Sequence, residues 1–206
     1  TRFGEEITSM KALLKEGFDA IFVGSGAPLG KNLDLPGRAE TKENFHIGIE
    51  WLANVAFEHV SSIGKKVIVL GGGNTAMDCC RTSRRIGGKE VTVVVRSGFD
   101  EMKASPWEIE DAMNEDIPIL NFHVPKRLIA EDGKLTGMEF EKVRKEYDSN
   151  GRRLLIPTGE DPVIIPCDDV LCAVGQENSF PWIERDTGIE FDDWEVPILD
   201  KTTFQS

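Results

Sequence analysis

The most constraining feature of this sequence is the segment VIVLGGGNTAMD at residues 67–78, where a branched apolar run meets three glycines and a helix-like pattern. Gly71, Gly73 and Ala76 fit the spacing G-x-G-x-x-G/A. In that fingerprint the first glycine allows a tight turn, the second lets the backbone approach a pyrophosphate, and the third residue keeps helix and strand close. Backbone N–H groups and the positive end of the helix would face the phosphates. The segment predicts a dinucleotide-binding loop; the alternative is a tight strand–helix turn without a ligand.

The residues around the loop support a Rossmann-like α/β fold with a parallel sheet. Residues 65–71 are nearly all apolar at their centre, which suits a strand covered on both faces. A second buried strand is expected at residues 91–95, ending at Arg96. Between them, small residues at steps of four, three and four would let a helix lie close to the sheet; these are Ala76, Cys80, Ser83 and Gly87.

Two further helices are predicted on either side of this unit. Over residues 45–60, apolar residues recur at steps of four, three, four and four, the spacing of one helical face. Ser105, followed by Pro106 and Glu108, has the form of a capping box with proline at the first helical position. We expect that helix to end near Glu115.

The rest of the sheet structure is predicted from turns and β-type runs. EDG at 131–133 and SNG at 149–151 punctuate three such runs, which predicts an antiparallel β-meander as a crossover. Residues 169–174 return to the pattern of a buried strand, closed by Gly175. Near the start of the chain, residues 19–27 form a β-rich run that ends in Gly-x-Gly, and LDLPG follows as a turn.

The end of the second strand decides between NAD and NADP. An NAD enzyme usually places Asp or Glu there to hold the ribose 2′-hydroxyl, whereas this chain has Arg96 followed by Ser97. An arginine attracts a 2′-phosphate, and Lys103 can add a second charge. The sequence therefore favours NADPH over NADH. If Asp100 or Glu101 turned back to the ribose, the preference would weaken.

Other polar residues of this region have simpler roles. Asn74 and Thr75 lie in the mouth of the loop and are candidates for contacts to the phosphates. Asp78 is expected in the first turn of the helix, where the dipole stabilises a carboxylate. An arginine cluster is expected in the last turns, where cations suit the negative end of the dipole, rather than as a ligand site; it comprises Arg81, Arg84 and Arg85.

Composition excludes several classes of function. The 206-residue chain has a formal net charge of -12 and a pI near 4.8, so nucleic acids and anionic membranes would be repelled over most of its surface. It shows no apolar run long enough to span a bilayer and no signal-like N-terminus, which favours the cytoplasm. The four cysteines form no C-x-x-C pair and only three histidines are present, so no metal site and no catalytic residue is nominated.

Three segments together carry a family resemblance: GGGNTAMDCCRTSRR, VTVVVRSGFDEMKASPWEIEDA and VLCAVGQ. They resemble the NADPH-binding part of the glutamate synthase small-subunit family, and the related module of dihydropyrimidine dehydrogenase is similar. These are flavin-dependent oxidoreductases with two dinucleotide-binding domains. The resemblance covers nearly the whole chain and implies that NADPH gives hydride to FAD, from which electrons pass to iron–sulfur clusters in a partner protein or domain.

The resemblance also implies residue roles. The pyrophosphate would be held by Gly71, Gly72, Gly73, Asn74 and Thr75. The adenosine phosphate would be held by Arg96, Ser97 and Lys103, and the nicotinamide side would be approached by Ala173 and Gly175. Ser97 replaces a second basic residue of many relatives, and Lys103 an arginine of some, which weakens the expected NADP preference.

The family architecture places a nicotinamide domain within an FAD domain. We therefore expect an NAD(P)H-binding domain at residues 46–175, with residues 1–45 and 176–206 as parts of the FAD domain. The FAD-binding glycine loop and a Gly-Asp motif are absent, so an excised fragment that binds a nicotinamide nucleotide without retaining flavin is expected. Two alternatives are a module that senses NAD(P) without redox activity, and a dehydrogenase of another lineage in which the loop binds FAD.

Overall fold

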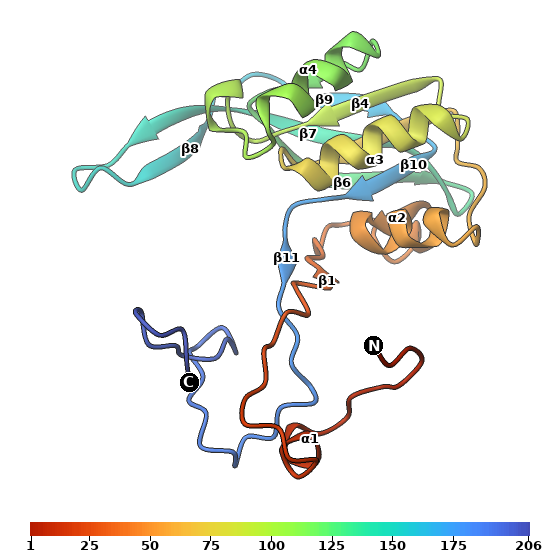
Figure 1. The fold of residues 1–206 in the computed structure, drawn as a ribbon. Helices are drawn as coiled ribbons and strands as arrows, with labels where there is room; N and C mark the ends of the chain where they lie inside the picture. The colour runs from red at the N-terminus through yellow and green to blue at the C-terminus, as the bar shows by residue number, and fades with distance from the viewer. The chain divides into compact units, whose positions relative to one another are not determined.

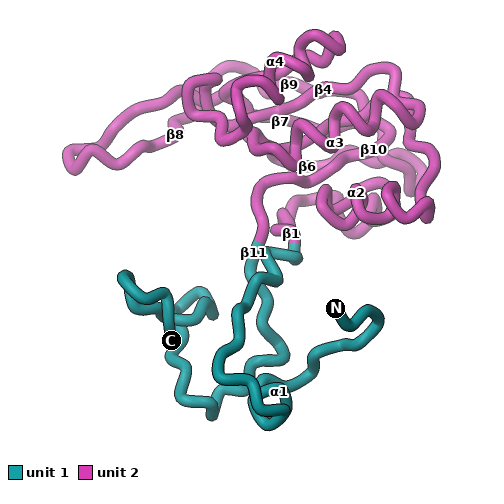
Figure 2. Tube along the Cα trace, in the orientation of Figure 1, with its two compact units in different colours: residues 1–29, 177–206 teal, residues 30–176 magenta.

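A computed structural model describes residues 1–206 and divides into two compact units (Figure 2). The larger unit comprises residues 30–176. The smaller unit comprises residues 1–29 and residues 177–206. No helix in the structure is long and apolar enough to cross a membrane.

The larger unit is built on a five-stranded parallel sheet with the order β2-β10-β3-β4-β5. Figure 1 labels β4 and β10 of this sheet. β3, which precedes the glycines, lies in the middle and pairs with β10 on one side and β4 on the other. The strands are β2 (Phe45–Ile47), β3 (Lys66–Leu70), β4 (Glu90–Val94), β5 (Ile119–Leu120) and β10 (Asp169–Cys172).

Helices cover one face of this sheet, and an antiparallel sheet covers the other. The helices of the larger unit are α2 (Gly48–Ala56), α3 (Asn74–Arg85) and α4 (Pro106–Asn114), with short 3-10 turns η1 (Lys42–Asn44) and η2 (Phe99–Glu101). The antiparallel strands are β6 (His123–Glu131), β7 (Lys134–Tyr147), β8 (Arg153–Pro157) and β9 (Val163–Pro166), with β7 pairing all three others. They form the crossover between β5 and β10.

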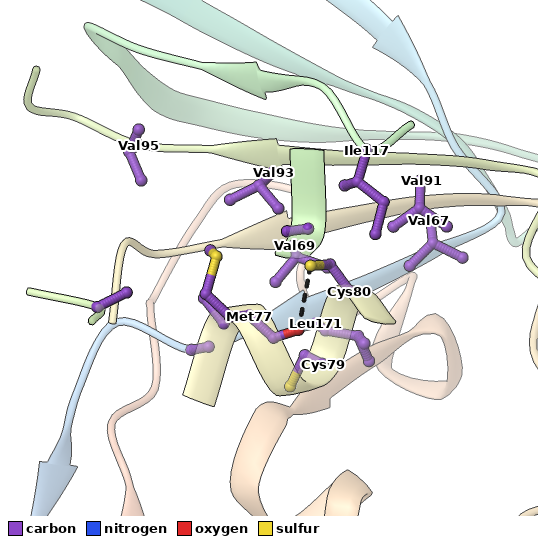
Figure 3. Packing of buried hydrophobic residues seen from close by; sticks show 14 of the residues in the cluster. Val67, Val69, Met77, Cys79, Cys80, Val91, Val93, Val95, Ile117 and Leu171 are labelled. Carbon is purple, nitrogen blue, oxygen red and sulfur yellow. Dashed lines mark hydrogen bonds between the residues drawn. The ribbon is translucent and has the colours of Figure 1, made fainter. Parts of the chain in front are cut away.

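The alternation of side chains along β3 explains the two cores. Val67 and Val69 point toward the helices and join a cluster with Met77, Cys79 and Cys80 of α3 (Figure 3). The intervening residues of β3 point the other way and pack against β6 and β7 through the cluster Ile68, Leu70, Leu128, Met138 and Phe140. A strand buried on both faces needs a near-continuous apolar run, so the composition of β3 follows from its central position.

The predicted α/β architecture is confirmed, with differences in its elements. Residues 45–47 form β2, in register with Val170–Cys172 of β10, and the helix begins only at Gly48. Pairing with a neighbouring strand therefore overrides the helical periodicity of Phe45. Residues 169–172 form β10, the last strand of the parallel sheet in chain order, which stops short of the expected end at Val174.

The smaller unit contains little regular structure. Its helix α1 (Met10–Leu14) is capped by Ser9 and by Glu184, whose carboxylate accepts hydrogen bonds from Ser9 and from the backbone N–H groups of Met10 and Lys11. The strand expected at residues 19–27 does not form; the nearest strand, β1 (Leu29–Gly30), pairs only with β11 (Gln176–Glu177). The side chain of Phe22 is 94% exposed.

Candidate dinucleotide site

The carboxyl ends of β10, β3 and β4 bring the predicted site residues to one edge of the parallel sheet. The N–H of Gly71 donates to the carbonyl of Val94 at 3.0 Å, and the N–H of Ala173 donates to the carbonyl of Leu70 at 2.8 Å. These bonds hold the three strand ends together immediately before the chain turns away. In open α/β sheets, ligands bind outside the carboxyl ends of the strands.

Each glycine of the loop has a different environment. Gly71 has a φ of +130°, and a β-carbon there would overlap with the carbonyl oxygen of Ala173. A β-carbon at Gly72 would press against Val95 and Met102. Gly73 instead faces open space, because a β-carbon would meet no atom within 4 Å. The tight turn thus requires Gly71, while Gly73 leaves room for a ligand to approach the backbone.

The amino terminus of α3 opens onto the space beside Gly73. Gly73 is the N-cap residue, and no side chain caps the helix. Unpaired N–H groups of a first turn and the positive end of the dipole favour an anion. Asp78, expected in the first turn, is the fifth residue of α3, and the first turn contains no acidic residue that would compete with a phosphate.

The segment after β4 is joined to the glycine loop by four hydrogen bonds. The N–H groups of Lys103 and Ala104 donate to the carbonyl of Gly72 at 2.9 and 3.0 Å. The N–H of Ser105 donates to Oδ1 of Asn74 at 2.8 Å. Asn74 therefore ties the two loops together. The predicted capping box at Ser105 does not form. Ser105 is the N-cap of α4, but its side chain makes no capping bond, and its hydroxyl accepts the fourth hydrogen bond, from Nδ2 of Asn74 at 3.5 Å.

Arg96 and Lys103 are exposed cations without a protein partner. Neither side chain makes an ion pair or hydrogen bond. Ser97 lies between them in sequence, and its carbonyl accepts a hydrogen bond from Asn121 at 2.8 Å, which fixes the backbone after β4. In a chain with a net charge of -12, two unpaired cations next to a glycine loop are a local feature suited to an anion.

The neighbouring acids Asp100 and Glu101 are both engaged by the β7–β8 hairpin. Lys145 Nζ lies 3.3 Å from Asp100 and 3.4 Å from Glu101, and Arg153 Nη1 lies 3.1 Å from Glu101. Burial by itself lowers the pKa of Lys145, but the hydrogen bonds and charges of Asp100 and Glu101 outweigh it and raise that pKa. Neither acid forms an ion pair with Arg96.

The arginine cluster of α3 is engaged with neighbouring elements. Arg81 lies 3.2 Å from Glu108, 3.0 Å from Asp111 and 2.9 Å from Glu115. Arg85 shares Glu115, and Arg84 donates to the carbonyl of Lys89. Arg81 thus joins α3 to α4 rather than marking the last turn, and the cluster has a structural role as expected.

The segment after β10 contacts Lys31 near the start of the larger unit. Ala173 is 8% exposed, and Gly175 has a φ of +140° with the stem of Lys31 against it. The carbonyl of Gly175 accepts a hydrogen bond from the N–H of Lys31 at 3.0 Å. Ala173 lies beside Gly71 because its N–H is bonded to the carbonyl of Leu70, whereas Gly175, beyond the end of β10, is exposed.

The cysteines are free and buried. Burial raises the pKa of both Cys80 and Cys167 to about 12, and it also raises the pKa of Cys79 and Cys172. All four are therefore neutral thiols at neutral pH, packed in the two cores, and none is activated as a nucleophile.

A family model described as pyridine nucleotide-disulphide oxidoreductase matches residues 5–203. The chain belongs to this family. A curated member, the NADPH-Fe(3+) oxidoreductase subunit beta of Geobacter sulfurreducens, is 33% identical over 201 residues, covering 96% of this chain and 30% of the relative. The glutamate synthase [NADPH] small chain of Halomonas elongata is 37% identical over 194 residues, covering 87% of this chain and 40% of the relative. The chain thus spans less than half the length of these oxidoreductases, and the family resemblance predicted from its motifs is confirmed.

Two solved structures share the fold of this chain. FprA from Mycobacterium tuberculosis in complex with NADPH has a TM-score of 0.67 at 19% identity, with 88% of this chain and 54% of FprA covered. The thioredoxin reductase of T. acidophilum has a TM-score of 0.60 at 16% identity, with 84% of this chain and 49% of the reductase covered.

Sequence reasoning missed the contacts that connect the loops. It took Asn74 as a phosphate contact without its bonds to Ser105, and it left out Met102, which packs against Gly72. It also gave no role to Lys145 and Arg153. Both residues lie more than 40 residues along the chain from the acids that they bind, so no local sequence pattern could indicate these ion pairs.

Proposed function

We propose that residues 46–175, within the larger unit, bind NADPH in a flavin-dependent oxidoreductase. The observation that carries this proposal is the pair of unpartnered cations, Arg96 and Lys103, beside the uncapped amino terminus of α3 and the open space at Gly73. Backbone N–H groups suit a pyrophosphate, and a guanidinium suits the 2′-phosphate that distinguishes NADPH from NADH.

In this proposal the residues of the chain bind and orient the cofactor. The loop from Gly71 to Thr75 holds the pyrophosphate, with Gly73 giving the closest backbone approach. Arg96, Ser97 and Lys103 hold the adenosine phosphate. Ala173 and Gly175, at the end of the neighbouring strand β10, lie on the nicotinamide side. When bound, NADPH supplies the hydride that FAD accepts, so the protein's task is proximity and orientation rather than acid–base chemistry.

We further propose that residues 1–45 and 176–206 belong to the FAD-binding part of the parent enzyme, which passes electrons to an iron–sulfur protein or domain. Large apolar side chains of these segments are exposed, with Phe22 at 94% and Trp194 at 80%, as expected for surfaces that the rest of a flavin domain would cover. The purified chain is expected to be colourless. A yellow protein with flavin absorbance would contradict this part of the proposal.

The experiment that tests cofactor binding is calorimetric titration of the chain with NADPH and with NADH, at low and at higher salt. We expect tighter binding of NADPH, with a preference that falls as salt screens the phosphate contacts. Replacement of Arg96 by alanine should weaken NADPH binding about tenfold and leave NADH binding nearly unchanged, because a charge-assisted hydrogen bond is lost only with the 2′-phosphate. Arg127→Ala is a matched control, since Arg127 pairs with Glu139 on the antiparallel sheet. Tighter binding of NADH, or an unchanged affinity of Arg96→Ala, would overturn the NADPH assignment.

A further inference from the structure

The segment after β4 carries as many acids as cations. Between residues 96 and 105, the charges of Arg96 and Lys103 are cancelled by those of Asp100 and Glu101. By itself this segment has no surplus positive charge for a phosphate. In NAD enzymes, an acid close to the end of the second strand normally accepts a hydrogen bond from the ribose 2′-hydroxyl.

Two cations from the antiparallel sheet change this balance. Lys145 and Arg153 lie on one face of the β7–β8 ribbon, because Arg153 pairs with Tyr147 and Lys145 is two residues before Tyr147. From that face Lys145 binds both acids, and Arg153 binds Glu101. With these two cations included, the six charged residues together have a net charge of +2.

Of the two acids, Glu101 is the one whose position depends more on the cations of the hairpin. Its side chain is 19% exposed, against 72% for Asp100. Its Oε2 atom is buried and makes no hydrogen bond, so the guanidinium of Arg153 at 3.1 Å compensates its charge. Without the hairpin cations, this carboxylate would be free to turn toward solvent and toward the neighbouring cations of its own segment.

We propose that Lys145 and Arg153 set the cofactor selectivity of this site, by holding Asp100 and Glu101 away from the 2′ position of the adenosine ribose. The inference rests on the proposed function, because it concerns the same nucleotide. Both are positioning residues that act through the acids and do not touch the cofactor. The antiparallel crossover therefore contributes to selecting a phosphorylated nucleotide, in addition to covering one face of the parallel sheet.

The test compares the ratio of the NADH and NADPH dissociation constants in the wild-type chain and in the double variant Lys145→Gln/Arg153→Gln. Release of two carboxylates near a 2′-phosphate should lower this ratio roughly threefold to tenfold, chiefly through weaker NADPH binding. The matched control is Lys142→Gln/Arg144→Gln, which removes the same charge. These two residues belong to β7 but face away from Lys145 and pair with Glu160 and Glu146.

A rescue variant separates this role from a structural one. Addition of Asp100→Asn and Glu101→Gln to the double variant should restore the wild-type ratio within about twofold, because both freed charges are then removed. A loss that persists in this quadruple variant would show direct phosphate contact or a displaced loop, and it would overturn the inference. An unchanged ratio in the double variant, with NADPH still bound, would overturn it while leaving the proposed function intact. Failure of the wild-type chain to bind either nucleotide would reject the proposed function and, with it, this inference.

Discussion

At Gly71 the backbone combines a φ of +130° with a close approach to the carbonyl of Ala173. An alanine there would have to adopt a strained conformation and displace the end of β10. We expect Gly71→Ala to lower the free energy of unfolding by about 2–4 kcal/mol, measured by urea denaturation followed by far-UV circular dichroism. We expect the substitution to reduce stability because Gly71 lies where the ends of the neighbouring strands β3 and β10 are in contact.

Gly73 is the matched control two residues later. Its φ of -102° is accessible to alanine, and a β-carbon would meet open space. Gly73→Ala should therefore leave the unfolding free energy within about 1 kcal/mol of wild type, yet weaken NADPH binding because the methyl group occupies the phosphate side of the loop. Unchanged NADPH binding by a folded Gly73→Ala chain would place the pyrophosphate elsewhere.

The contact between α3 and α4 depends on one guanidinium among three carboxylates. Burial alone would raise the pKa of Glu115, but the hydrogen bond from Arg81 and the charges of Arg85 and Arg81 hold it below its usual value of 4.5. A carboxyl whose folded-state pKa is lowered stabilises the fold above its unfolded pKa, and this stabilisation is lost as the pH falls through the folded value. Arg81 therefore supports the fold at neutral pH more than in acid.

We expect Arg81→Gln to lower the free energy of unfolding at pH 7 by roughly 1–2 kcal/mol, since three acids then face one another without their shared partner. The difference from wild type should shrink in urea titrations as the pH falls below 4.5 and through the lowered pKa at which folded Glu115 is protonated. Arg85→Gln is the control with the smaller effect, because Arg85 is 56% exposed and shares only Glu115. A difference that stays constant between pH 7 and pH 4 would contradict this account of the contact.

The elements that the sequence predicted well are those with strong local patterns. The unbroken apolar run of β3, the glycines after it and the capping position of Ser105 all appear where local chemistry puts them. The short strands β2 and β5 were missed because two or three residues carry no periodicity of their own. They are strands only because a longer neighbour pairs with them.

The features of the candidate site also divide into those with a local sequence signal and those without one. The glycine loop and Arg96 could be predicted from a fingerprint and a strand end, because both are local in sequence. The bond from Ser105 to Asn74 and the ion pairs from the β7–β8 hairpin could not, since they join segments that only the folded sheet brings together. Asn74 and Ser105 are 31 residues apart. The structural role of α3's arginines was predicted, but their partners on α4 were not.

At the scale of the whole molecule, apolar burial is concentrated in residues 30–176. Both hydrophobic clusters lie entirely within that range, and outside it only Met10 and Ile183 are buried apolar residues. Since burial of apolar surface is the main favourable contribution to folding, the two units should differ widely in the free energy needed to open them.

Hydrogen–deuterium exchange of the intact chain measures that difference. We expect the amides of β3, which are bonded to strands on both sides, to exchange only through global unfolding. Most amides of residues 1–29 and 177–206 should exchange within about tenfold of the unfolded rate, because most of their hydrogen bonds close short local turns and only Met10 and Ile183 are buried apolar residues there. The exceptions should be Met10 and Lys11, whose N–H groups donate to Glu184 at 3.1 and 3.2 Å. If residues 177–206 were protected as strongly as β3, the smaller unit would have a stability that its burial does not explain, and the proposal that it needs the rest of a flavin domain to cover its apolar side chains would fail.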